Sequence, residues 1–238
     1  MIKMMILAPR KDGMTHSEFR HYVSEVHGPL VKSVPEVARG IRHYHYNFPV
    51  FDLHDAAFGH PRADHLDIVT EAWFDSRLAQ IRNMSGPEYL SIVRPDEGRF
   101  ANEAGALMHY THEIEITAGG WSGDKLFVMR RRREGLSRAE FQSRWRAAFT
   151  EIVAESAVWS QVVSRCVQNH TLPEELLHNG QDPAYFDVID ELFLRARGDG
   201  AALAADAPFQ AELRALEQEL LAPERTLSLV TETIRNIA

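Results

Sequence analysis

Apolar residues recur at intervals of three and four in the stretch that follows Thr15. Phe19, Val23 and Leu30 carry this pattern, so they share one face of a predicted helix. Thr15 and Glu18 have the spacing of a capping box, in which each side chain satisfies a free backbone N–H group of the first turn. The pattern therefore predicts an amphipathic helix that begins directly after Thr15.

The predicted helix carries a histidine on its apolar face. His27 lies four residues after Val23, and Gly28 and Pro29 follow it directly. Proline has no backbone N–H group, and its ring clashes with the preceding turn of a helix. We therefore expect the helix to kink or end just after His27, which leaves the imidazole at an opening.

Alternation of apolar and polar residues predicts four strands in the first half of the chain. These strands cover residues 2–8, 41–48, 65–74 and 107–116, and a helical segment around 77–83 and a short helix near Glu88 lie between the last two. Successive side chains of a strand point to opposite faces of the sheet. His43 and His45 therefore share one face of their strand, and Tyr44 and Tyr46 share the other.

The same order of elements occurs a second time. The capping box and the apolar stripe recur from Ser137, at a shift of 122 residues from Thr15, and the strand around Glu71 recurs around Glu191, at a shift of 120. Self-similarity over such a distance indicates a tandem duplication. The second copy predicts strands from residue 125, at 162–169, 186–194 and 227–237, with helices from Ser137 and over 201–221.

Each half thus has the order β-α-β-β-α-β of a ferredoxin-like unit, which places the chain in the α+β class. A four-stranded antiparallel sheet with helices on one face leaves its other face bare. Two such sheets can cover each other by closing an eight-stranded barrel, here within one chain as an intramolecular pseudo-dimer. We expect a first repeat over residues 1–118, a linker over 119–124 and a second repeat over 125–238.

Composition narrows the classes of function. With 45% apolar and 25% charged residues the chain is of ordinary globular type, and its formal charge of −8 argues against general binding of nucleic acids or anionic membranes. No apolar run is long enough to cross a bilayer. Cys166 is the only cysteine, which excludes an internal disulfide and suits a reducing compartment. We expect a cytoplasmic protein.

Three segments of the first half resemble the EthD family of the dimeric α/β-barrel superfamily: GMTHSEFRHYVSEVHGPLV, DIVTEAWFDS and SGPEYLSIVRPDEGRF. The second half matches the same pattern, so the resemblance covers nearly the whole chain as two EthD-like repeats, and it implies the barrel described above. Members of the family are ancillary or catalytic proteins of ether degradation and of fungal polyketide pathways, where dehydratase-type roles are assigned. The wider superfamily includes cofactor-free monooxygenases, lactone isomerases, polyketide cyclases and heme proteins. The family's helix-end histidine falls on His27, and its acidic-aromatic strand falls on Asp67, Glu71 and Trp73.

His27 is the first candidate for chemistry, as a general acid or base. A lone histidine on an apolar face is usually a core residue bonded to a backbone carbonyl group. Two observations weigh against that interpretation here: the helix break beside His27, and its replacement by Phe149 in the second copy. Ten of the twelve histidines precede Gly119, which places imidazole chemistry in the first half.

Other candidates surround this residue. We expect His45 to take part in proton transfer and His43 to bind substrate; the two side chains are roughly 7 Å apart along one strand. Glu71 is a candidate for orienting an imidazole, with Asp67 four residues away on the same face. Both acids recur in the copy that lacks His27, however, so hydrogen bonds to the backbone are the simpler interpretation of their role.

Aromatic residues and arginines complete the set. Tyr22, Tyr44, Tyr46 and Trp73 are either core residues or an apolar wall with hydroxyl groups, which suits a flat aromatic ligand. The run 130–133 consists of arginines at a strand end. We expect it to be solvated, and the alternative is a clamp for a carboxylate or phenolate. Phosphate-binding glycine loops, Ser-His-Asp arrangements and zinc-type spacings are absent from the sequence.

Three hypotheses follow from the sequence. The leading one is an enzyme that dehydrates, cyclises or isomerises an aromatic or polyketide-like small molecule by acid/base catalysis, without cofactor or metal. The second is a heme- or metal-dependent oxidative enzyme of the same barrel type, with His27 or His45 as ligand. The third is a non-catalytic accessory protein of a degradation pathway. A homodimer of the chain stays open in each case.

Overall fold

The computed structural model describes residues 1–50, 60–121, 124–173, 186–222 and 226–237. The first half contains β1 (Ile2–Ala8), α1 (His16–Tyr22), η1 (Val23–His27), α2 (Gly28–Ser33), α3 (Pro35–Gly40), β2 (His43–Pro49), β3 (Ile68–Phe74), α4 (Arg77–Met84), η2 (Tyr89–Val93), α5 (Arg94–Phe100), η3 (Glu103–Gly105) and β4 (Leu107–Thr117). The second half contains β5 (Lys125–Arg130), α6 (Arg138–Glu155), α7 (Trp159–Val162), β6 (Val163–Thr171), β7 (Val188–Leu194), α8 (Gly200–Ala205), α9 (Ala207–Leu220) and β8 (Leu227–Ile237).

The described strands form a closed eight-stranded barrel in the order β1-β3-β2-β8-β5-β7-β6-β4. Neighbours such as β1 and β3, or β5 and β7, run antiparallel. The predicted α+β class and the predicted eight-stranded barrel are therefore confirmed.

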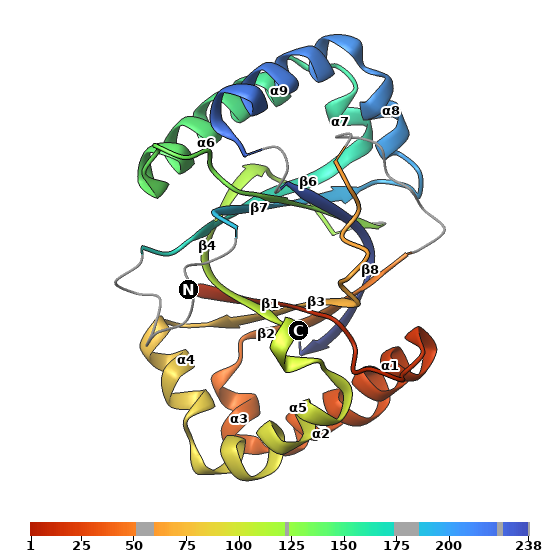
Figure 1. Ribbon diagram of the computed structural model, residues 1–238, viewed down its shortest axis with the longest axis vertical. Helices are drawn as coiled ribbons and strands as arrows, with labels where there is room; N and C mark the ends of the chain where they lie inside the picture. Colours follow the sequence, from red (N-terminus) through yellow and green to blue (C-terminus); the bar gives the residue numbers. More distant parts are fainter. Residues whose placement is uncertain (51–59, 122–123, 174–185, 223–225, 238) are drawn as a thin grey trace. The chain divides into compact units, whose positions relative to one another are not determined.

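The contacts between residues divide the chain into two compact units. The first unit takes the described residues of 1–49, 64–112 and 233–238, and the second takes those of 50–63 and 113–232. Each unit thus includes a short segment that the other half of the sequence supplies. Figure 1 shows that, within the first unit, helices α1 to α5 lie on one side of the strands. The boundary predicted at residues 119–124 stays a prediction.

The first helix begins as the sequence predicts. Thr15 accepts a hydrogen bond from the backbone of Glu18, whose carboxylate accepts one from the Thr15 backbone. The break expected after His27 takes the form of a π-helical turn, η1, and the chain then continues as α2 with Pro29 in its first turn. The Gly28 N–H group reaches back five residues to the Val23 carbonyl oxygen. This wider turn carries the helix past a proline that would end a regular α-helix.

A second π turn lies before another proline. In η2 the Arg94 N–H group bonds to the Tyr89 carbonyl oxygen, and Pro95 stands in the first turn of the α5 helix that follows. The second half has no proline at either place, and its helices α6 and α9 are regular. π turns are rare and often lie at functional sites, so this difference marks the first half.

The helix predicted over 201–221 is two helices in the structure, and that prediction was wrong. Asp206 ends α8 and accepts a hydrogen bond from the Phe209 backbone, as the N-cap of α9. Pro208 occupies the first turn of α9, where its missing N–H group costs nothing. A cap and a proline in sequence therefore outweigh the continuous apolar pattern.

Aromatic residues fill the layer between helices and strands in each unit. In the first unit Phe19 contacts Phe48 and Phe100, with ring centroids 6.3 and 5.9 Å apart. In the second unit Trp145 stacks on Phe149 at 5.5 Å, and both side chains are fully buried. On β2, the face that alternation predicted to be aromatic, with Tyr44, Tyr46 and Phe48, is thus the face that packs against the helices.

The opposite face of each sheet carries a buried charged pair. Lys3 Nζ lies 2.5 Å from Glu71 Oε1, and Asn47 Nδ2 donates to Glu71 Oε2 at 2.8 Å. In the second half Lys125 lies 3.1 Å from Glu191, and Asn169 donates to this glutamate at 2.6 Å. Because both copies keep the lysine, the glutamate and the asparagine, we interpret these groups as structural.

Glu71→Leu would leave the Lys3 ammonium group in a buried site without this counter-charge. We expect the free energy of unfolding to fall by about 3–5 kcal/mol, as measured by urea denaturation. The double variant Lys3→Met/Glu71→Leu removes both charges and is expected to recover most of this loss. Equal destabilisation of the single and double variants would show that the ion pair is not the cause.

Candidate active site

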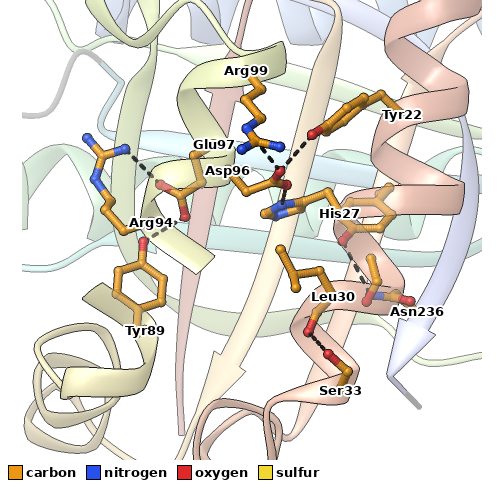
Figure 2. A network of polar contacts seen from close by, with 12 residues as sticks. Tyr22, His27, Leu30, Ser33, Tyr89, Arg94, Asp96, Glu97, Arg99 and Asn236 are labelled. Carbon is orange, nitrogen blue, oxygen red and sulfur yellow. Dashed lines mark hydrogen bonds and ion pairs between the residues drawn. The ribbon is translucent and has the colours of Figure 1, made fainter. Parts of the chain in front are cut away.

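His27 lies at the end of η1 and is buried, with 3% of its surface exposed. Its Nδ1 atom is 3.0 Å from Oδ2 of Asp96, which comes from the first turn of α5. Figure 2 shows this pair, with the α1–η1–α2 helix on one side and α5 on the other. His27 is the last residue of the π turn η1, and Asp96 lies three residues after the end of the π turn η2. Both members of the pair therefore come from distorted helical segments.

The carboxylate of Asp96 is engaged through both oxygens. The Tyr22 hydroxyl donates to Oδ1 at 2.6 Å, while the exposed Arg99 side chain comes no closer than 3.9 Å. A carboxylate only accepts hydrogen bonds, so we assign the hydrogen of the neutral His27 ring to Nδ1. The lone pair is then on Nε2.

The Nε2 atom of His27 faces a tyrosine. The Tyr44 hydroxyl, from β2, lies 3.5 Å away, and the ring of Phe100 packs on the imidazole at 4.7 Å between centroids. Burial raises the pKa of Tyr44, so this hydroxyl keeps its proton and acts as a donor. The imidazole therefore stands between a group that only accepts and a group that donates.

Burial lowers the pKa of His27 below its ordinary value, and the hydrogen bond and charge of Asp96 oppose this shift in part. The ring is thus neutral near pH 7, which is the state that a general base requires.

The second half lacks this arrangement. Hydrogen bonds fix the correspondence: Lys11 donates to the carbonyl of Phe100 in one half, and Arg133 donates to that of Leu220 in the other. With these shifts of 122 and 120, the residues at the places of His27, Tyr44 and Asp96 are Phe149, Cys166 and Leu216. All three polar partners are replaced by residues of the apolar core.

Comparison with known proteins finds a family match in the first half of the chain. Residues 11–104 match the EthD domain. We refer to residues 11–104 as the EthD domain after this match. The resemblance stated from the sequence is confirmed for these residues, which include His27, Asp96, Tyr22 and Tyr44.

One curated relative is the conidial pigment biosynthesis dehydratase EthD of Metarhizium robertsii. It is 28% identical over 123 residues, which cover 49% of this chain and 85% of the relative.

Solved structures share the fold of the whole chain. An anthrone oxidase-like protein aligns with a TM-score of 0.63 at 12% identity, over 99% of this chain and 93% of its own. A putative monooxygenase from Fusobacterium nucleatum gives a TM-score of 0.57 at 8% identity, over 98% and 91%. A putative chlorite dismutase gives 0.52 at 8%, over 99% and 96%. At these identities the likeness concerns the fold alone.

The structure divides the candidates of the sequence analysis into two groups. Tyr22 and Tyr44 lie at His27 of the EthD domain, and the ring of Tyr46 packs on Tyr44 at 4.9 Å. The remaining candidates lie on the opposite face of β2 and β3 or at its edge: His43, His45, Asp67, Glu71 and Trp73.

His45 and His43 contact the Trp73 ring at 4.8 and 5.8 Å between centroids. These residues therefore do not converge on His27 as a metal site would require. No group of three or more His, Cys, Asp or Glu side chains in the described part of the chain is arranged to hold a metal ion.

The two acids predicted from the sequence have other partners. Glu71 pairs with Lys3, and Asp67 accepts from the backbone and the guanidinium group of Arg10 at 2.8 and 2.6 Å. The carboxylate that orients His27 is Asp96, which the sequence analysis missed. The repeat contained a signal for this residue, because Leu216 occupies in the second copy the place that Asp96 occupies in the first.

The second half has a buried polar cluster of another kind. Arg130 is fully buried, so the expectation of a solvated strand end was wrong for this residue. It pairs with Asp190 at 2.8 Å and with Glu217 at 3.4 Å, and it lies over the Trp145 ring at 4.5 Å. Burial raises the pKa of Asp190 to about 6. The guanidinium group thus has two carboxylate partners within the protein.

None of the described helices has both the length and the apolar character needed to traverse a bilayer.

The pKa of His27 can be measured by NMR titration of ring signals in histidine-labelled protein. We expect a value below 6.5 in the folded protein, because burial disfavours the charged ring. Asp96→Asn removes the charge that favours the imidazolium ion, so the pKa is expected to fall further. A wild-type pKa at or above 6.5, or an increase in Asp96→Asn, would contradict the assigned geometry.

The same shift makes stability depend on pH. A histidine whose pKa is lower in the folded state binds its proton first in the unfolded chain, so stability falls as the pH decreases below about 6.5. The loss ends at the lower pKa of the folded state. His27→Phe/Asp96→Leu, which gives the EthD domain the residues of the second half, is expected to lack this part of the pH dependence. Denaturant midpoints between pH 7 and pH 4 measure the difference.

Proposed function

We propose that the EthD domain is a cofactor-free acid/base catalyst that removes water from a small aromatic ketone, with His27 as the base. The observation that carries the proposal is the position of the imidazole between Asp96 at 3.0 Å and the Tyr44 hydroxyl at 3.5 Å. An oriented, neutral histidine beside a protonated hydroxyl group provides a base and a hydrogen-bond donor in one place.

The two groups suit an elimination next to a carbonyl group. Nε2 of His27 takes the proton from the carbon beside the carbonyl, and the Tyr44 hydroxyl donates a hydrogen bond to the carbonyl oxygen as it gains negative charge. The electron pair then forms the carbon–carbon double bond as the β-hydroxyl group leaves. Nε2 returns its proton to this hydroxyl group, so water departs and the protein is unchanged.

The direction of the reaction is supported by the relative. The Metarhizium robertsii protein is called a dehydratase of pigment biosynthesis, and it is similar to the part of this chain that contains the site. The side chains around His27 are mostly aromatic, namely Tyr22, Tyr44 and Phe100, which favours a flat substrate. All of these residues belong to one chain, so the proposed reaction needs no second copy.

Access to the imidazole requires local opening, since only 3% of His27 is exposed. Short segments surround it: η1 has five residues and α2 has six. The π turn interrupts the regular hydrogen bonding of this continuous helix, and we assign to it the movement that admits substrate.

The oxidative alternative would use the same imidazole as a ligand. The Nε2 atom faces the Tyr44 hydroxyl, and this neighbour favours proton exchange with an oxygen over ligation of a metal. A visible absorption spectrum after incubation with heme distinguishes the two functions, because ligation by His27 would shift the Soret band of the added heme, and His27→Phe would lack this shift.

The proposal is tested with a hydroxytetralone, a bicyclic β-hydroxy aryl ketone that becomes a fluorescent naphthol when it loses water. We expect the wild-type protein to form the naphthol and to exchange the hydrogen beside the carbonyl in deuterated water. His27→Phe is expected to lower both rates by about 100-fold or more, the usual effect of losing a general base.

A matched control is His21→Phe, which replaces an exposed histidine of the same helix and is expected to keep wild-type rates. Circular dichroism and the unfolding midpoint show that each variant is folded. A folded His27→Phe protein with wild-type rates, or a wild-type protein that neither exchanges nor dehydrates such ketones, would falsify the proposed function.

A further inference from the structure

Asn236, near the end of β8, makes two contacts beside His27 of the EthD domain. Its Nδ2 atom donates to the Gly28 carbonyl oxygen at 3.2 Å and to the Tyr46 hydroxyl oxygen at 3.3 Å. Gly28 directly follows His27, and Figure 2 shows Asn236 against this part of the helix. By its contacts, this end of β8 belongs to the same compact unit as His27.

The close approach of Asn236 requires a glycine. A Cβ atom at Gly28 would lie 3.1 Å from both Nδ2 and Oδ1 of the asparagine. Such a distance is tighter than ordinary van der Waals contact, so the amide would have to move away. Gly28 therefore allows Asn236 to reach the backbone at the π turn.

The second contact of Asn236 leads to His27 through two tyrosines. The rings of Tyr46 and Tyr44 pack edge to face with their centroids 4.9 Å apart. Burial raises the pKa of Tyr44, and a hydrogen bond from the Tyr46 hydroxyl opposes this shift in part. The Tyr44 hydroxyl then faces Nε2 of His27 at 3.5 Å. The polar groups thus form a continuous series from β8 to the imidazole.

The chemistry of the two ends gives this series one direction. An amide NH₂ group only donates, so the Tyr46 oxygen accepts from Asn236 and its hydrogen is left for Tyr44. At the other end the Asp96 carboxylate only accepts, which leaves Nε2 of His27 as an acceptor for Tyr44. Both fixed ends therefore favour the same orientation of the Tyr44 hydroxyl.

The second half of the chain lacks the whole series. The residues at the places of Asn236, Gly28, Tyr46 and Tyr44 are Ile116, Thr150, Gln168 and Cys166. If Asn236 served only the fold of the barrel, the equivalent strand end would be expected to keep it, as both halves keep the buried lysine, glutamate and asparagine. The series is present only where His27 and Asp96 are present.

We propose that Asn236 is a positioning residue that, through Tyr46, holds the Tyr44 hydroxyl beside Nε2 of His27, from where its hydrogen turns to the carbonyl oxygen when the ketone binds. This inference deepens the proposed function, and its catalytic consequence rests on that function. The residue lies outside the matched EthD domain, so β8 supplies a component that the domain of residues 11–104 does not contain. Its effect is on the orientation of a donor, since Asn236 reaches His27 only through Tyr46, Tyr44 and the Gly28 backbone.

The test is a double-mutant cycle of Asn236→Leu and Tyr46→Phe in the full chain. With the hydroxytetralone, each single variant is expected to lower kcat about tenfold with little change in KM, the effect of one misplaced hydrogen bond. The double variant is expected to lose no more than either single one, because both residues act along one series. Arg235→Ala, an exposed position on the same strand, is the matched control and is expected to keep wild-type kinetics.

A second readout does not depend on turnover. In ¹⁵N-histidine-labelled protein the Nε2 signal of His27 is expected to move in both single variants, and the pKa of His27 is expected to rise, because a donor to Nε2 stabilises the neutral ring. Gly28→Ala displaces the asparagine without changing it and is expected to give the same shift. This variant keeps the test valid if Asn236→Leu does not fold.

The outcomes separate the two claims. If the Nε2 signal moves while the wild-type protein leaves the ketone unchanged, the positioning role stands and the proposed function fails. An unchanged Nε2 signal and pKa in folded Tyr46→Phe and Gly28→Ala would overturn the positioning role, whatever the turnover. Additive losses of kcat in the double variant would do the same.

Discussion

The contact between Nδ1 of His27 and the carboxylate of Asp96 is the interaction on which the site depends. It fixes the tautomer, because the carboxylate cannot donate, and it partly compensates the cost of placing an imidazole in an apolar layer. The other polar groups are arranged around this constraint. Tyr22 donates a hydrogen bond to the other carboxylate oxygen of Asp96, and the Tyr44 hydroxyl lies beside the other ring nitrogen of His27, Nε2. Without the carboxylate, either ring nitrogen of His27 could carry the hydrogen, and the Tyr44 hydroxyl would have no defined partner.

The duplication acts as a control within one molecule. Groups that both halves keep, such as the pairs Lys3–Glu71 and Lys125–Glu191, support the shared fold. Among the described residues, only the first half has a histidine paired with a carboxylate at this place, the tyrosines around them and the two π turns with their prolines. The second half replaces them with a continuous aromatic core and regular helices, and its own buried charge lies elsewhere, at Arg130. The comparison therefore separates what the barrel needs from what the site needs.

Most of the fold followed from the sequence because its determinants are local. The capping box joins Thr15 to Glu18, three positions later, and the faces of β2 follow from strict alternation. The site depends on distant pairs instead. Asp96 is 69 residues from His27, and Asn236 is 208 residues from Gly28. The periodicity of apolar residues contains no information about such pairs. The helix α5 that contains Asp96 is mostly polar, so its sequence predicts a solvent-exposed segment. Only the substitution by Leu216 in the repeat could have revealed it.

The buried lysine–glutamate pairs have a consequence for the behaviour of the barrel on heating. Hydration of ions becomes less favourable as temperature rises, so the cost of keeping an ammonium and a carboxylate group away from water decreases. Contacts between apolar side chains gain no comparable advantage over the same range. Within each unit the strands are thus held by apolar contacts, which gain little in warm solution, and by a buried ion pair, Lys3–Glu71 or Lys125–Glu191, whose cost decreases on heating.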